Sequence, residues 1–155
     1  MRQREDLSEM FDYDRWANSR WLDPAKALGA EDVLLHIVQA QVIWLCRIEG
    51  TQIWKVTLPE LPLHMERIGR GWRRFLLGAD FGQVVQYQNF QGEHCENTIS
   101  EIVRHVINHG TYHRGHLRGM AEERGLEFPE TDFIAYVREQ KGLAGGGRRS
   151  VAGVL

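Results

Sequence analysis

The sequence predicts an all-α protein, and three observations lead to this prediction. Apolar side chains recur at helical spacing in four long stretches of the chain. Glycine and proline residues, which are typical of turns, mark most of the segments between these stretches. Four of the seven histidines stand within twelve residues, also at helical spacing, from His105 to His116. A chain of 155 residues has the length of one domain and can bury a core without disulfide bonds.

The composition argues against several classes of function. Hydrophobic residues make up 43% and charged residues 26% of the chain, and the net charge is −2, so no basic surface for nucleic acid is expected. No apolar run approaches the roughly 20 residues that span a bilayer, and the N-terminus leads into no apolar signal core. We therefore expect a cytoplasmic protein that binds neither nucleic acid nor a membrane. Cys46 and Cys95 are too few for a disulfide scaffold, and neither lies in a motif of a nucleophile.

The first helix is expected around residues 7–21, where apolar residues recur at helical spacing and define one face. Two polar residues, Asp14 and Asn18, interrupt that face. The simpler interpretation is that they lie at its edge and touch solvent. The alternative is that they accept hydrogen bonds from metal-binding imidazoles, which usually donate their second N–H to an oxygen. Asp23-Pro24 then predicts a helix cap and a kink or restart.

Further elements follow in order. A second helix is expected over 31–49, and a proline-containing loop over 50–63 leads to a third helix with His64 exposed at its start. Loose alternation over 84–96, around Gln91-Gly92, predicts a short hairpin or extended excursion. Thr131-Asp132 can cap a short last helix over 133–140, although Asp132 could instead touch a histidine. The glycine- and arginine-containing tail, 141–155, is expected to be disordered.

The histidine-rich helix begins at Thr98, with Glu101 three residues later as a capping box, and ends near Arg124-Gly125. Its four histidines share a stripe about 80° wide. His109 and His113, one turn apart, can direct their imidazoles at a common point, as a transition metal requires. Apolar residues continue the stripe, which predicts that the histidines face inward; these residues are Ile102, Val106, Leu117 and Met120.

A third ligand is needed if this pair binds a catalytic metal, because such metals typically take three protein ligands and keep one position open. His36 lies on one face of the second helix with Ala40, Ile43 and Trp44. A lone histidine on an apolar face is more often a core residue than a ligand. Because His109 and His113 on another helix lack a third ligand, His36 is the candidate for that ligand.

Several segments together resemble the DinB-like (DNA-damage-inducible, YfiT-like) family of metal-dependent enzymes over residues 5–139. These are Tyr13-Asp-Arg-Trp16-Ala-Asn18, His36, the most specific segment Asn108-His-Gly-Thr-Tyr-His-Arg-Gly115, and Thr131-Asp-Phe-Ile-Ala-Tyr-Val-Arg-Glu139. The resemblance implies a four-helix bundle with a crossover excursion and a short C-terminal helix, over residues 1–140. It also implies a homodimer and a divalent metal ion, nickel or zinc, on three histidines. These fall on His36, His109 and His113.

The chain departs from this family at two places. The connection from Asp23 to Glu31 is short, and position 116, commonly glutamine in the family, is histidine. The imidazole of His116 either fills the open metal position or faces a dimer partner. His105 lies one turn too far along the helix to ligate together with His109 and His113, so we place it beside the ligands or in the core.

The leading functional hypothesis is the transfer of a low-molecular-weight thiol to a small electrophile, as the resemblance to thiol transferases of this fold implies. Three neutral imidazoles leave a divalent metal its full charge, which can activate a bound thiol or water. No glutamate lies inside the histidine motif as in H-E-x-x-H, so no general base is evident, which favours thiol chemistry over metal-dependent hydrolysis. The remaining alternatives are a non-catalytic metal- or ligand-binding bundle and a purely structural histidine cluster.

Overall fold

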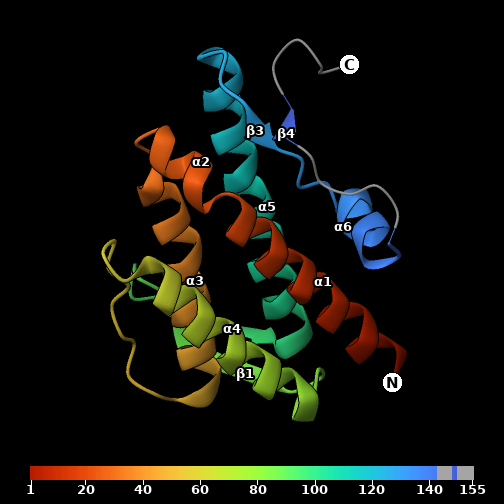
Figure 1. Cartoon of the computed structure of the whole chain (residues 1–155). Helices are drawn as coiled ribbons and strands as arrows, with labels where there is room; N and C mark the ends of the chain where they lie inside the picture. The colour runs from red at the N-terminus through yellow and green to blue at the C-terminus, as the bar shows by residue number, and fades with distance from the viewer. Residues whose placement is uncertain (143–147, 150–155) are drawn as a thin grey trace.

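Four long helices form the molecule's main body. The computed structural model describes residues 1–142 and 148–149, and its long helices are α1 (Arg2–Arg20), α3 (Glu31–Glu49), α4 (Leu61–Gly78) and α5 (Ile99–Glu123). Helices α1 and α3 each pack against both α4 and α5, which closes the four into a bundle (Figure 1). The predicted all-α four-helix bundle is confirmed.

Shorter elements join and flank these helices. Helix α2 (Leu22–Ala27) follows α1, and α6 (Phe133–Gln140) is the short C-terminal helix. Strands β1 (Val84–Gln88) and β2 (His94–Thr98) form an antiparallel hairpin with Val84 opposite Thr98, which is the predicted crossover excursion between α4 and α5. Strand β3 (Phe128–Pro129) pairs with β4 (Arg148–Arg149).

The core lies between the four long helices and contains two tryptophans that are almost wholly buried, Trp21 and Trp72. The rings of Phe11 and Trp72 lie 5.3 Å apart, and Trp72 donates its indole N–H to the Gln41 carbonyl at 3.1 Å. This contact satisfies the polar end of a buried ring. It also holds α4 against α1 and α3.

The break between α1 and α2 falls at Trp21. The predicted restart is therefore confirmed, but Asp23 is not its cap. Pro24 lies in the first turn of α2, where a missing N–H removes no helical hydrogen bond. Trp21 instead donates its indole N–H to Thr131 Oγ1 at 3.1 Å, which ties this break to the segment before α6.

The start of α5 is set by the predicted capping box. The Glu101 N–H donates to Thr98 Oγ1 at 3.2 Å, and the Thr98 N–H donates to Glu101 Oε2 at 2.8 Å. Thr98 is also the last residue of β2, so the hairpin leads into α5 without a loop. The position of the histidines along α5 is thereby set from its first turn.

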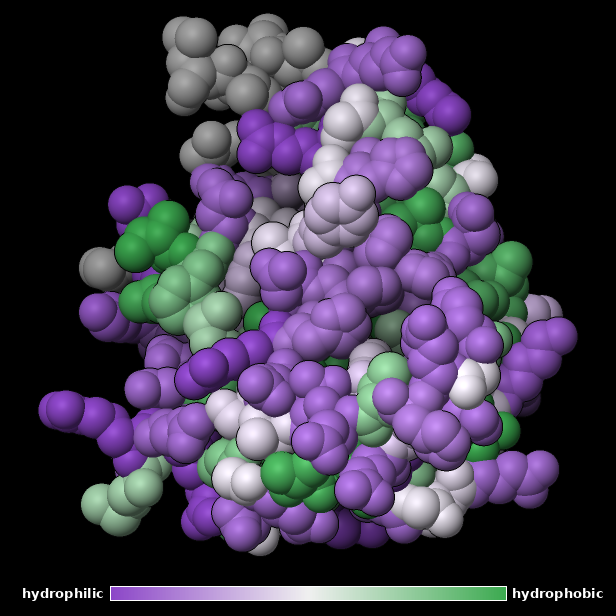
Figure 2. Space-filling model, turned by 180° about the vertical axis from the view of Figure 1, so that it is seen from behind, coloured by the Kyte–Doolittle hydropathy of each residue, from purple (hydrophilic) through white to green (hydrophobic). Residues whose placement is uncertain are grey.

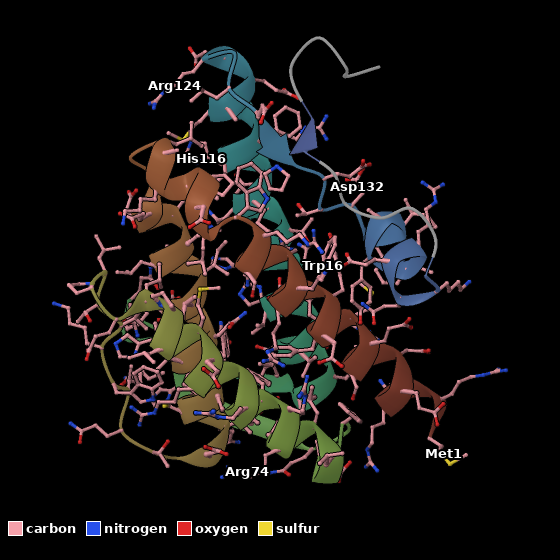
Figure 3. The ribbon with its side chains drawn as sticks, in the orientation of Figure 1. Met1, Trp16, Arg74, His116, Arg124 and Asp132 are labelled. Atoms are coloured by element: carbon pink, nitrogen blue, oxygen red, sulfur yellow. The ribbon has the colours of Figure 1, made fainter. Side chains whose placement is uncertain are left out.

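Helix α6 packs against α1 through Tyr13, Trp16 and Tyr136, and the Trp16 indole donates to Glu139 Oε2 at 2.8 Å (Figure 3). Asp132 occupies the cap position but makes no capping hydrogen bond, and no contact between Asp132 and a histidine is seen among the described residues. His64 is not exposed as predicted, since it packs half-buried against Trp54.

Two further predictions concern the C-terminal tail and membrane-spanning helices. The predicted disordered tail, 141–155, falls largely outside the described residues and stays a prediction. In the described part of the chain, none of the helices has the length and apolarity to cross a bilayer.

Candidate metal centre

Three histidine side chains from two helices converge on one point. Helix α3 supplies His36, and α5 supplies His109 and His113. His109 Nε2 lies 3.1 Å from His36 Nε2 and 3.1 Å from His113 Nε2, and one ring nitrogen from each residue falls within 4.8 Å of the others. The structure thus brings together the three residues that the sequence named as ligands.

The spacing of these nitrogens fits a metal ion. Histidine nitrogens bind zinc at about 2.1 Å, so two such ligands lie about 3.0 to 3.4 Å apart in octahedral or tetrahedral geometry. Hydrogen bonds explain the contacts less well. The Nε2 atom of a neutral imidazole carries either one proton or one lone pair, so His109 cannot form two full hydrogen bonds there. The cluster can therefore hold a metal ion.

The cluster lies at the surface of the bundle, which corrects the prediction that its histidines face inward. His36 is exposed, and His109 and His113 are half-buried. The core-facing side of α5 is occupied by Val103, Val106 and Leu117, so the histidine stripe beside it turns toward solvent, on the side where α5 packs against α3. Figure 2 views the molecule from the side of α3 and α5 and shows a largely hydrophilic face.

The surroundings of His109 and His113 favour their neutral forms. Desolvation by burial, with smaller contributions from the nearby His113, His36 and His105, lowers the pKa of His109 to about 4. Burial also lowers the pKa of His113, with smaller effects from His36 and His116. Because neutral imidazole is the form that ligates metal, binding near pH 7 requires no proton release from these two residues.

Two other histidines of the α5 stripe lie outside the group of three. His105 is exposed, and its ring centroid lies 5.7 Å from that of His109 and 5.4 Å from that of Trp44. His116 is also exposed and lies nearer to the C-terminal end of α5 (Figure 3). Both are neighbours of the cluster, and their predicted support of the ligands stays a prediction.

The two polar residues of α1 are buried, so the prediction that they touch solvent is wrong. Asp14 is 0% and Asn18 3% exposed. Asp14 accepts hydrogen bonds from Arg114 at 2.6 Å, Gln41 at 2.8 Å and Asn18 at 3.1 Å. These donors, rather than an imidazole, engage both carboxylate oxygens.

Arg114 is the residue that sequence reasoning missed. Its Nη1 atom donates to Asp14 Oδ1 and, at 2.7 Å, to Asn18 Oδ1, and its side chain is only 3% exposed. Two features of the sequence could have indicated this ion pair. Arg114 directly follows His113 in the histidine motif, and Asp14 and Asn18, four residues apart, interrupt an apolar helix face. Each half of the ion pair could have predicted the other.

A close approach of α1 and α5 accompanies this ion pair. A Cβ atom on Gly110 would lie 2.2 Å from Asp14 Oδ1 and 2.9 Å from Arg114 Nη1, so only glycine leaves room for the carboxylate. Gly110 follows His109 and Arg114 follows His113 in the chain. The buried ion pair therefore sets the rotation of α5 beside both ligands.

The donor set contains histidine alone. Among the residues that the structure describes, no carboxylate or thiol joins the group of three. Cys46 is buried in the core, and Cys95 is half-buried on β2. Neutral imidazoles suit zinc, nickel, copper and iron, so the donor set does not by itself choose between nickel and zinc.

The fold and the site together define a class, that of helical-bundle proteins in which three histidines from two packed helices can hold a metal ion. The chain belongs to the DinB family, whose model matches residues 1–145. It is 25% identical over 158 aligned positions to Protein DinB of Bacillus subtilis (strain 168), covering 83% of this chain and 92% of that protein. No solved structure matches the chain.

Proposed function

We propose that this protein is a metal-dependent enzyme that transfers a low-molecular-weight thiol to a small electrophile. The observation that supports the proposal is the convergence of three imidazoles on a solvent-facing surface, with His109 Nε2 3.1 Å from the Nε2 atoms of both His36 and His113. A divalent nickel or zinc ion held there keeps its full charge, because its ligands are neutral, and it lowers the pKa of a thiol or water at its open position.

The chain's own residues supply binding and access. His36, His109 and His113 would hold the ion, and because His36 is exposed, a thiol and an electrophile could reach it from solvent. In the transfer, the thiol sulfur forms a new bond to the electrophilic carbon and its proton passes to solvent. The leaving group departs with the electron pair of the bond that breaks.

Two alternatives differ from this proposal in what they require. Metal-dependent hydrolysis benefits from a general base beside the bound water, and no described carboxylate joins the histidine group. A non-catalytic metal- or ligand-binding bundle requires the same histidines but no turnover.

We also propose that the protein is a cytoplasmic homodimer. Light scattering coupled to size-exclusion chromatography measures its mass and so checks the oligomeric state.

The metal assignment is tested by elemental analysis of protein purified without an affinity tag. We expect about one nickel or zinc ion per chain, lost in His36→Ala, His109→Ala and His113→Ala, with the helical circular dichroism unchanged. His94→Ala, on the exposed hairpin, is the matched control and should keep its metal. His116→Gln should also keep it. Normal metal content in a ligand variant would refute the assignment.

The reaction class is tested on the metal-loaded protein with two substrate pairs. A thiol transferase consumes glutathione, cysteine or coenzyme A with 1-chloro-2,4-dinitrobenzene, whereas a hydrolase releases nitrophenol from 4-nitrophenyl acetate. Thiol consumption that disappears in His109→Ala supports the proposal. Ester hydrolysis alone supports the first alternative, and a metal-loaded protein inactive in both assays supports the second.

A further inference from the structure

Arg47 occupies an unusual position on the same stripe of α3 as His36. Its guanidinium carbon lies 4.7 Å from the ring centroid of Trp44, 4.9 Å from that of Tyr87 and 5.1 Å from that of Phe90. Three aromatic rings, one from α3 and two from the hairpin region, therefore orient the cation. Contacts of this kind attract a cation without neutralising its charge.

Across the residues that the structure describes, the guanidinium has no anionic partner. None of the described carboxylates forms an ion pair with Arg47, whereas Arg114 pairs with Asp14 and Arg70 with Glu66. Its one hydrogen bond runs from Nη2 to the Gln88 carbonyl at 3.5 Å. Because arginine carries five N–H donors, most of them remain for a ligand.

A continuous strip of rings connects this cation with the metal centre. We call Tyr87, Trp44 and His105 the aromatic strip. Tyr87 and Trp44 lie 5.0 Å apart, Trp44 and His105 5.4 Å, and His105 lies 5.7 Å from the ligand His109. Along α3, the Cα atom of Arg47 lies eleven residues beyond that of His36, which is about 16 Å along the helix axis and places both residues on one stripe.

We propose that Arg47 and the aromatic strip bind the anionic far end of the thiol whose sulfur reaches the three-histidine centre. This inference rests on the proposed function and names its substrate class. A carboxylate or phosphate pairs with the planar fork of a guanidinium through two parallel hydrogen bonds. The arm of the thiol lies along Trp44. Because the rings of Trp44 and His105 lie between the guanidinium and His109, cysteine is too short to reach both sites, and an extended thiol such as a small peptide or a pantetheine derivative suits them.

The test measures binding without turnover, by calorimetric titration with S-methylated thiols, on metal-loaded and metal-free protein. S-methyl-4′-phosphopantetheine and S-methylpantetheine differ only in the phosphate, and S-methylglutathione presents carboxylates instead. We expect at least one of the two anionic ligands to bind about tenfold or more tightly than neutral S-methylpantetheine. The anionic ligand that binds more tightly shows whether the site prefers a phosphate or a carboxylate.

Arg47→Gln should abolish this preference, and Arg47→Lys, which keeps the charge but loses the fork, should retain part of it. Arg67→Gln is the matched control, because Arg67 also lies over an aromatic ring, that of Trp54 at 4.2 Å, outside the strip. A preference that survives undiminished in folded Arg47→Gln, or the absence of any preference in the wild type, would overturn the inference.

Failure of the proposed function gives a different result. Arg47→Gln should contain as much metal as the wild type, since Arg47 is no ligand. If the wild type binds no metal or turns over no thiol but keeps its Arg47-dependent anion preference, the function is wrong and the anion site stands. If turnover is found with no effect of Arg47→Gln on anionic thiols, the function stands and the anion site is wrong.

Discussion

At the scale of single residues, the buried pair of Asp14 and Arg114 is the strongest electrostatic feature beside the metal centre. Burial raises the pKa of the Asp14 carboxyl, while the Arg114 guanidinium and the amide groups of Asn18 and Gln41 oppose that rise. Both side chains are at most 3% exposed, so each depends on the other for a counter-charge. The ion pair therefore holds α1 against α5, the helix that carries His109 and His113.

Removing one partner should therefore be costly. Asp14→Ala leaves Arg114 buried without its counter-ion and should lower the free energy of unfolding by about 3 to 5 kcal/mol. Asp12→Ala is the control: Asp12 pairs with Arg73 at 3.1 Å on the surface, where its side chain is 42% exposed, and should cost at most about 1 kcal/mol. Urea unfolding of the metal-free proteins measures both values. Equal losses would show that the buried pair has no special role.

At the scale of elements, the fit between α1 and α5 depends on Gly110. The carboxylate of Asp14 occupies the space that any larger side chain at this position would need. Gly119 lies on the same helix, and a Cβ added there would meet nothing within 4 Å. Comparing alanine substitutions at the two glycines therefore separates the effect of helix packing on stability from the effect of helix propensity.

Alanine at these two positions should act in opposite directions. Gly110→Ala should destabilise the protein by about 1 to 3 kcal/mol, because the helices must move apart. Gly119→Ala should stabilise it by up to about 1 kcal/mol, since alanine favours the helix more than glycine does. Thermal unfolding of the two variants checks the signs. A stabilising Gly110→Ala would contradict the close approach of α1 and α5.

At the scale of the whole molecule, the three histidines connect α3 with α5 across the surface of the bundle. An ion that binds the folded cluster and not the unfolded chain must stabilise the fold by mass action. The hydrophobic core of the bundle includes both buried tryptophans and none of the three histidines. Metal should therefore strengthen the fold without being required for it.

Nickel or zinc at about 100 times its dissociation constant should raise the free energy of unfolding by about 2.7 kcal/mol. His36→Ala should remove most of this gain, because only that ligand comes from α3. Magnesium, which prefers oxygen ligands, is the control ion and should have no comparable effect. The measurement is urea unfolding with each ion and after chelation. An equal gain in His36→Ala would show that the ion does not bridge the helices.

The sequence by itself determined the elements and the identity of the clustered histidines. The capping box at Thr98, the turn at Gln91-Gly92 and the spacing of His109 and His113 are local features, so a few neighbouring residues specify them. His36 followed from the need for a third ligand and from the family resemblance. The capping box, the turn and the His109–His113 spacing each depend on a few neighbouring residues, whereas His36 could not be predicted from its own local sequence.

Only the tertiary structure decided which way these elements face. A histidine stripe beside an apolar stripe is compatible with a buried or an exposed position, and the packing of α5 against α1 and α3 turned it outward. The same packing buried Asp14 against Arg114, 100 residues away in sequence, and placed Arg47 among rings from the hairpin. Burial and ion pairing arise from contacts between helices, and local periodicity does not encode the rotation of one helix against another.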